Sequence, residues 1–319
     1  MDLIQHDKNS QSSASLPSAI TQLCSADRYL ISLRSKNSRR TMRSALNSIT
    51  RLLGKVNYRD VSFHSMQSSD VDLIIEMLST KSCLSPTTIN LYLSAMKGVF
   101  KHCWKTKQIS YEDYLMLKTI DEFKGSRIKR NKVILLKEQV LAIIEYAESL
   151  GTIKGARDTA IISILGGCGL RRDEVSCLTI KDYSSSRALL YVHGKGNKER
   201  IADIPKNAKD KLDVWLSLRG EHEGAIFCRI SKHDTIFNNK TKISGQAVYN
   251  VLESMAVGVG IKKIHPHAMR HYFGTTLIRK GVDIVTVRDM LGHESVSTTE
   301  KYIDESSEAR KNAVELVDI

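Results

Sequence analysis

Residues 265–302 read HPHAMRHYFGTTLIRKGVDIVTVRDMLGHESVSTTEKY, and the rest of the chain is best interpreted outward from this stretch. His267 and Arg270 stand three residues apart in a helical pattern, where such residues share one face, so both can point at one target. His293 and Tyr302 follow, nine residues apart. Two histidines, an arginine and a tyrosine in this order indicate chemistry at a phosphodiester.

Local signals also predict how the tyrosine is held. Gly292 is typical of a helix end, because glycine tolerates the left-handed conformation that closes many helices. Residues 297–300, STTE, have the pattern of a capping box and predict the start of a new helix. We therefore expect Tyr302 to lie on a short and well-defined helical turn.

Composition limits the class of protein. The chain has 319 residues, of which 41% are hydrophobic, and this is enough for two globular domains. A formal charge of +13 favours a polyanionic partner, nucleic acid first and an anionic membrane surface second. The sequence has neither a long apolar run nor the pattern of a signal peptide, so we expect a soluble, cytoplasmic protein with no membrane association.

Cysteine and histidine spacing gives no sign of a metal site. The six cysteines are scattered without a CxxC pair, which favours small buried hydrophobes in a reducing compartment over a zinc site or a disulfide framework. His265, His267 and His271 are grouped, but no cysteine or carboxylate stands at ligand spacing beside them. We expect no bound metal and no other cofactor.

The N-terminal part predicts a helical domain. Residues 1–16 are rich in Ser, Gln and Asn and are expected to be a disordered lead-in. Residues 17–117 have the apolar periodicity of a helical domain. Its four expected helices are residues 16–34, a second that begins at a cap at Asn37 or Ser38 and runs to Leu53, residues 69–80, and a fourth that begins at Ser85-Pro86. Residues 118–133 are polar and basic without an apolar period, and predict an interdomain linker.

Two of these helices have a basic stripe apart from their apolar face. The stripe contains Arg40, Arg43 and Arg51 on the second helix, and Lys97 and Lys101 on the fourth. For either stripe alone, a merely solvated helix face is an open alternative. Two stripes in one domain of a basic chain favour contact with a phosphate backbone, in DNA or RNA.

Residues 134–319 predict a second domain, which is mostly helical. After helices near 137–150 and 156–165 comes a glycine-rich turn at 166–169, and Arg171 then stands at a helix start. Such an arginine is well placed to meet an anion together with free backbone N–H groups, although a plain surface residue is the alternative.

A β-hairpin is expected next. Strands at 188–193 and 200–204 flank the sequence GKGNKE, with Lys195 near the tip. The phosphate-binding pattern GxxxxGK[ST] of nucleotide hydrolases is absent and no strand-loop-helix surrounds this glycine pair, so we reject nucleotide hydrolysis. A helix at 207–218, a strand at 225–229 and a helix at 244–257 complete a mainly α (α+β) fold with a small antiparallel sheet.

Taken together, the candidate residues resemble one family. In order they are Arg171, Lys195, His267, Arg270, His293 and Tyr302. They lie in the motifs GLRRDEVSCL, VHGKGNKER, HPHAMRHYFGTTL and LGHESVSTTEKY, which resemble those of the tyrosine recombinase (phage-type integrase) family, and most of all its simple Xer-like members and mobile-element integrases. The resemblance is strong from residue 135 to the C-terminus and looser over residues 18–110, which resemble the family's core-binding domain.

The resemblance implies a role for each candidate. Tyr302 is the nucleophile that attacks a DNA phosphodiester and leaves a 3′-phosphotyrosyl link. Lys195 protonates the 5′-oxygen leaving group, and His267 assists proton transfer. A phenol with a pKa of about 10 is a poor nucleophile at neutral pH, so the tyrosine needs a proton acceptor and a cationic pocket.

The remaining candidates, Arg171, Arg270 and His293, are implied to bind the scissile phosphate. Forked guanidiniums match the equatorial oxygens of a pentacoordinate phosphorane and stabilise the charge that develops there. Arginines in that role make a metal unnecessary. Glu174 also matches the family, as a structural partner of Arg171 rather than a catalyst, and the departures at Met269 and Cys168 affect packing.

The implied partner is double-stranded DNA, bound by a homo-tetramer on two sites, possibly with a related recombinase. The segment after Tyr302 is expected to dock on a neighbouring subunit or to pack in cis. The alternatives are a type IB topoisomerase, which relaxes supercoils as a monomer, and a non-catalytic DNA-binding architectural protein. The DNA site, and the choice between chromosome dimer resolution and movement of a mobile element, stay open.

Overall fold

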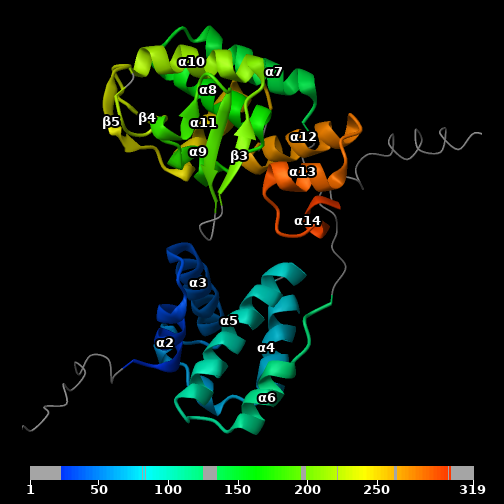
Figure 1. Cartoon of the computed structure of the whole chain (residues 1–319). Helices are drawn as coiled ribbons and strands as arrows, with labels where there is room; N and C mark the ends of the chain where they lie inside the picture. Colours follow the sequence, from blue (N-terminus) through cyan, green and yellow to red (C-terminus); the bar gives the residue numbers. More distant parts are fainter. Residues whose placement is uncertain are drawn as a thin grey trace, which may run out of the picture. The chain divides into compact units, whose positions relative to one another are not determined.

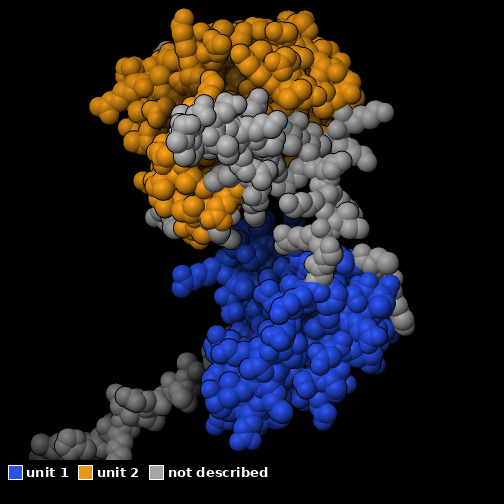
Figure 2. Space-filling view, turned by 90° about the vertical axis from the view of Figure 1, so that its right-hand side faces the viewer, with its two compact units in different colours: residues 1–130 blue, residues 131–319 orange. Residues whose placement is uncertain are grey.

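The chain divides into two compact units, residues 1–130 and 131–319 (Figure 2). The computed structural model describes residues 23–80, 82, 84–124, 135–194, 199–220, 222–261, 264–300 and 302. The expected lead-in, the second half of the expected linker, Lys195 and the segment after Tyr302 lie outside the described residues.

The first unit is built around one long central helix. Its elements are α2 (Ser25–Ser32), α3 (Lys36–Leu52), the 3-10 turns η1 (Tyr58–Asp60) and η2 (Phe63–Ser65), α4 (Ser68–Thr80), α5 (Pro86–Lys105) and α6 (Tyr111–Thr119). Helix α5 packs against α2, α3, α4 and α6 (Figure 1), because its apolar residues recur around much of its circumference. Leu93, Met96 and Phe100 of α5 are buried in one hydrophobic core with Leu46 and Ile49 of α3.

Helix caps in this unit follow the sequence with one correction. The hydroxyl of Ser85 accepts a hydrogen bond from the Thr88 N–H, and Pro86 occupies the first turn of α5, as expected. Helix α3 is capped by Ser35, not by Asn37 or Ser38: the Ser35 hydroxyl accepts from the Ser38 N–H at 3.4 Å. Ser35 has the extended backbone that an N-cap needs, and the two expected caps lie inside the first turn.

The N-terminal unit extends further along the chain than the sequence predicts. Helix α6 is absent from the expectations because its nine residues have no clear apolar stripe, and it reaches Thr119. Ile120 and Phe123 then pack against the core of the unit. The Asn90 side-chain amide pairs with the backbone of Phe123 in both directions, and the Lys97 ammonium donates to the Ile120 carbonyl. Residues 118–124 of the expected linker therefore belong to this packed unit.

The second unit is organised around α8. Its helices are α7 (Lys137–Ser149), α8 (Ile153–Cys168), α9 (Arg172–Cys177), the 3-10 turn η3 (Ile180–Asp182), α10 (Lys206–Arg219), α11 (Gly245–Gly258), α12 (Pro266–Arg279), α13 (Ile284–Leu291) and α14 (Ser297–Glu300). Helix α8 is buried along nearly its whole length and contacts α7, α9, α10, α11 and α12 (Figure 1). This architecture confirms the mainly α fold class.

Helix α8 is longer than the sequence predicts. The expected turn at 166–169 is helical as far as Cys168, and only Gly169, with φ 61°, adopts the left-handed conformation that ends the helix. A Cβ at Gly166 would meet Met269 Cε at 2.8 Å, and one at Gly167 would meet Ala208 Cβ at 3.2 Å. The glycines are there for close packing, which local sequence rules interpret as a turn.

Two small antiparallel sheets complete this unit where the sequence predicts one. Strands β1 (Tyr183–Ser184), β2 (Leu189–His193) and β3 (Glu199–Asp203) form the first, and β4 (Cys228–Ile230) pairs with β5 (Ile236–Lys242) in the second. In the first sheet Val192 stands opposite Arg200. Residues directly opposite share a face, and Val192 is buried, so Arg200 points inward with it.

Candidate active site

Arg270 is a buried cation near the middle of α12. The helix is capped by His265, whose ring accepts a hydrogen bond from the Ala268 N–H at 3.1 Å. The Arg270 side chain is 1% exposed and donates to the carbonyls of Gly169 at 2.8 Å and Leu291 at 2.5 Å. Burial, together with the Arg171 charge, lowers the pKa of Arg270 to about 10, so it stays charged at neutral pH.

Arg171 approaches the same place from the start of α9. Its backbone N–H donates to Glu174 Oε2 at 2.9 Å, and its guanidinium donates to Glu174 Oε1 at 2.7 Å. The same guanidinium donates to the Gly292 carbonyl at 3.3 Å. Its side chain is 44% exposed, so the group is held in place on one side and open to an anion on the other.

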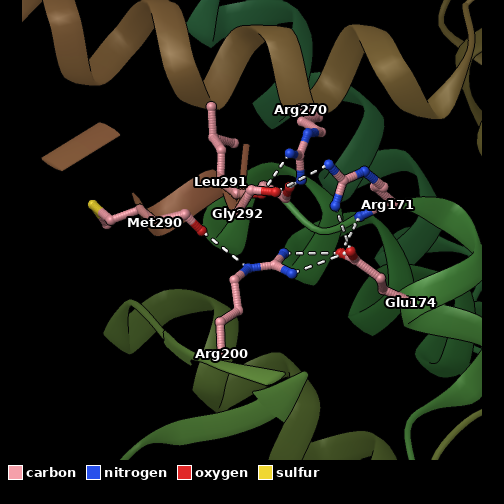
Figure 3. Close-up of polar contacts among 8 residues, drawn as sticks. Arg171, Glu174, Arg200, Arg270, Met290, Leu291 and Gly292 are labelled. Atoms are coloured by element: carbon pink, nitrogen blue, oxygen red, sulfur yellow. Dashed lines mark hydrogen bonds and ion pairs between the residues drawn. The ribbon is translucent and has the colours of Figure 1, made fainter. Parts of the chain in front are cut away.

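Glu174 joins Arg171 to a third arginine that the sequence did not single out. Arg200 of β3 donates to both oxygens of the Glu174 carboxylate, at 3.1 Å and 2.8 Å (Figure 3). These donors outweigh the effect of burial and lower the pKa of Glu174, so the carboxylate is ionised. The expectation that Glu174 is a structural partner of Arg171 fits these contacts.

The three arginines meet at the end of α13. The last carbonyls of a helix lack intrahelical donors and carry partial negative charge. Here each of three consecutive carbonyls accepts from an arginine of a different segment: Met290 from Arg200 at 3.1 Å, Leu291 from Arg270 and Gly292 from Arg171 (Figure 3). A cationic cluster is thereby held directly beside His293.

His293 is a neutral base within this cluster. Its Nδ1 lies 2.9 Å from the Thr299 hydroxyl. Burial of the ring and the charges of Arg270 and Arg171 lower the pKa of His293 to about 4. At neutral pH the imidazole is therefore uncharged, with one nitrogen as donor and the other as acceptor.

Tyr302 packs against this histidine and is 3% exposed. Its ring is parallel to that of His293, and the edge of the His271 ring meets it with centroids 4.8 Å apart. The expected helical support needs correction, because α14 ends at Glu300 and Tyr302 lies in the turn after it. The turn is closed by the Tyr302 N–H, which donates to the Thr299 carbonyl at 2.9 Å.

The start of α14 also differs from the expected capping box. The N–H groups of Thr299 and Glu300 both donate to the carbonyl of Val296, so the turn begins one residue before the expected cap. Ser297 is the first residue of the helix and not the residue that precedes it. The STTE pattern thus located the helix but not its cap.

His267 lies on the first turn of α12 and is exposed. Its ring stacks on that of His265, with centroids 6.4 Å apart and planes at 20°. Partial loss of hydration, followed by the Arg270 and His265 charges, lowers the pKa of His267. The histidine is thus neutral at physiological pH and suited to proton transfer.

Of the six residues expected to act in catalysis, four gather around the end of α13: Arg171 and Arg270 donate to its last carbonyls, and Tyr302 stacks on His293. His267 is coupled to them electrostatically, and Lys195 lies outside the described residues. Sequence reasoning missed Arg200 and His271. The signal for Arg200 was its place opposite an inward residue of the hairpin, and His271 directly follows an expected site residue.

The expected DNA-binding residues lie on the N-terminal unit. Arg40, Arg43 and Arg51 line an open groove of about 510 Å³ along α3, as their helical spacing predicts. Lys101 is exposed on α5. Lys97 is half-buried with its ammonium on the Ile120 carbonyl, so its contact within the unit is one that the sequence did not foresee.

The described part of the chain contains no group of three or more His, Cys, Asp or Glu side chains placed to hold a metal ion. None of the helices described combines the length and apolar character that a bilayer span requires.

Arginines and a tyrosine gathered at the end of one helix suit covalent chemistry at a phosphodiester, a reaction in which cationic side chains stabilise the anion and a hydroxyl attacks it. Residues 133–309 match the model of the phage integrase family, and the chain belongs to that family.

Known proteins similar to the chain agree with this assignment. A tyrosine recombinase of Pseudothermotoga lettingae is 28% identical over 296 residues, which is 90% of this chain and 94% of the relative. A tyrosine recombinase XerC of Treponema denticola is 28% identical over 265 residues, with 79% and 84% covered. A structure of the Tn1549 transposon integrase in complex with transposon right end DNA shares the fold, with TM-score 0.66, 16% identity and coverage of 92% and 99%.

Proposed function

We propose that the protein is a site-specific DNA recombinase that cleaves and rejoins DNA through a 3′-phosphotyrosyl intermediate, and so integrates, excises or resolves DNA at short core sites. The observation that carries this proposal is the packing of Tyr302 against His293 beside two arginines, on a chain of the phage integrase family. The naming of its relatives as tyrosine recombinases supports it.

The phosphate is bound by Arg171 and Arg270. A guanidinium has five N–H donors, and the contacts of Arg270 with Gly169 and Leu291 account for two nitrogens of its fork. The backbone contacts orient both arginines before DNA arrives, which is the preorganisation that stabilises developing charge. A phosphate oxygen between them is neutralised from two sides.

His293 supplies a neutral hydrogen bond to the same phosphate. In the tautomer that this role requires, Nδ1 accepts from the Thr299 hydroxyl, 2.9 Å away, and Nε2 carries the proton. This N–H donates to a nonbridging oxygen. The lowered pKa keeps the ring in this state throughout the physiological range.

Tyr302 attacks the phosphorus, and the bond between phosphorus and the 5′-oxygen breaks. The phenolic proton leaves toward His267, and Lys195 protonates the 5′-oxygen. The reverse step returns the phosphoryl group from the tyrosine to a free 5′-hydroxyl, so strands rejoin with no loss of bond energy and no nucleotide cofactor. Because Tyr302 is buried, DNA binding must release it from the pocket before attack.

Double-stranded DNA is held by both units in this proposal. The groove of Arg40, Arg43 and Arg51 follows the phosphate backbone, with Lys101 as an additional contact. Four protomers act on two sites, with a related recombinase as a possible second partner, and the segment after Tyr302 docks on a neighbouring subunit. A DNA substrate also fits the expected cytoplasmic location.

The deciding experiment uses a duplex that carries the target site with a nick beside the scissile phosphate, so that the covalent product accumulates. The site is first mapped by sequencing cleavage products of genomic fragments. We expect a protein–DNA adduct with the wild-type chain and none with Tyr302→Phe. The matched control is Tyr191→Phe, because Tyr191 is exposed on β2 and outside the site.

An undiminished adduct in Tyr302→Phe would remove this residue from its role. A recombinase should recombine two copies of the site, whereas a topoisomerase should relax plasmids that lack the site. An architectural protein would bind the site and yield no adduct at all.

A further inference from the structure

Arg200 uses three nitrogens of its guanidinium on two different segments. Its two terminal nitrogens donate to the Glu174 carboxylate at 3.1 Å and 2.8 Å, and its Nε donates to the Met290 carbonyl at 3.1 Å (Figure 3). Its side chain is 12% exposed, so these contacts compete little with water.

The carboxylate between the arginines has a full set of donors. Each oxygen of Glu174 accepts one bond from Arg171 and one from Arg200. Removing the Arg200 bonds would leave a buried charge held from the Arg171 side alone. The Arg171 guanidinium would then be drawn further toward the carboxylate and away from the Gly292 carbonyl.

The side chain also lies against the backbone that precedes His293. A Cβ added at Gly292 would stand 3.1 Å from Arg200 Cδ and 3.4 Å from its Nε. The glycine therefore makes room for the arginine, and the arginine in turn supports a residue with φ 63°. Arg200 is the second residue of β3, the strand that follows the sequence loop containing Lys195.

We propose that Arg200 is a positioning residue for strand cleavage: it holds Glu174 and the end of α13 together, and thereby sets Arg171 and His293 relative to the hairpin. This inference rests on the proposed function. Arg200 touches neither the phosphate nor the tyrosine in this scheme. Its effect on the reaction passes through the two residues that it places, so its loss should slow cleavage much more than it weakens DNA binding.

A lysine cannot replace this arginine. One ammonium on a flexible stem cannot span both carboxylate oxygens and the Met290 carbonyl with the fixed geometry of a planar fork. Arg200→Lys therefore keeps the charge and the fold while it loosens the linkage. Arg187, exposed in the turn before β2, offers the matched control, Arg187→Lys, with the same chemical change close to the same sheet.

The experiment measures single-turnover adduct formation and DNA affinity on the nicked duplex. We expect Arg200→Lys to lower the cleavage rate by about 100-fold, as expected for a misplacement of about 1 Å in a catalytic group. The dissociation constant should stay near the wild-type value, and Arg187→Lys should match wild type in both. Dilute guanidinium chloride should restore part of the rate to Arg200→Ala, and methylammonium chloride should not.

Two results would overturn the inference: a wild-type cleavage rate in Arg200→Lys, or a loss of affinity as large as the loss of rate. A measurement without DNA separates failure of this inference about Arg200 from failure of the proposed function. Amide hydrogen exchange at Gly292 and His293 should be faster in Arg200→Lys, because both N–H groups close the end of α13. If the wild-type chain forms no adduct, the proposed function fails, and unchanged exchange would then overturn the placement by Arg200 as well.

Discussion

The rings of Tyr302 and His293 lie parallel, with centroids 6.2 Å apart and an angle of 7° between their planes. Both side chains belong to the proposed reaction, yet in this structure the tyrosine is part of a small apolar cluster with Val287 and Leu291. The proposed nucleophile is therefore packed against a proposed phosphate-binding residue and is not presented to solvent.

The unfolding free energy should depend on His293 below neutral pH. Its pKa is near the ordinary 6.5 in the unfolded chain and about 4 in the fold, so between these values the unfolded state binds more protons. Stability is thus lost as the pH falls from 6.5 to 4, by on the order of 2 kcal/mol once solvent screening is allowed for. Urea unfolding of wild type and His293→Gln across this window measures it. Equal pH slopes in the two proteins would contradict the assignment.

Gly292→Ala should damage both stability and cleavage. Its φ of 63° costs an L-residue about 1 kcal/mol, and the new methyl group would also press on Arg200. Gly281→Ala is the control, because Gly281 has φ 82° with nothing within 4 Å of the added Cβ. Thermal unfolding should fall in both variants and further in Gly292→Ala, and only that variant should lose adduct formation. Equal losses would mean that backbone strain alone acts at Gly292.

Gly274→Ala should push the Tyr302 ring slightly out of its pocket. The added Cβ would lie 3.2 Å from Tyr302 Cζ, and the tyrosine sits on a short turn that can yield more easily than α12. Helix propensity favours alanine by about 1 kcal/mol, so the fold should not be weakened by the change itself. Chemical nitration of Tyr302, located by mass spectrometry, should become faster than in wild type. An unchanged nitration rate would show that the ring stays in its pocket.

Lys97 and Arg43 should separate a structural cation from a DNA contact. Lys97→Met loses the bond to the Ile120 carbonyl and should destabilise the N-terminal unit by about 1–2 kcal/mol, with little change in the salt dependence of DNA binding. Arg43→Gln should leave stability unchanged. It should reduce the magnitude of the slope of log K against log salt by about 1, because one phosphate contact is lost. Urea unfolding measures the stability of each variant, and binding titrations at several salt concentrations measure its salt slope. A reduced salt slope in Lys97→Met would return Lys97 to the DNA interface.

Local features were predictable to within a few residues. Helix α5 begins at Pro86 after the cap Ser85, because a hydroxyl suits the cap and a proline suits the first turn in any protein. The end of α8 was misjudged because Gly166 and Gly167 are selected by Met269 and Ala208, more than 40 residues away. The end of the N-terminal unit was misjudged for the same reason, since Asn90 and Lys97 hold residues that have no apolar period of their own.

The sequence by itself determined which groups are available for the reaction: a tyrosine, histidines and arginines in a recognisable order, with periodicities that make most of the chain helical. Tertiary structure alone decided that three arginines from α9, β3 and α12 bind three consecutive carbonyls at the end of α13, and that Tyr302 is buried. The physical reason is that periodicity and caps are local interactions. Every residue has a backbone carbonyl, so the sequence does not indicate which one binds a given side chain. That choice depends on how distant segments pack.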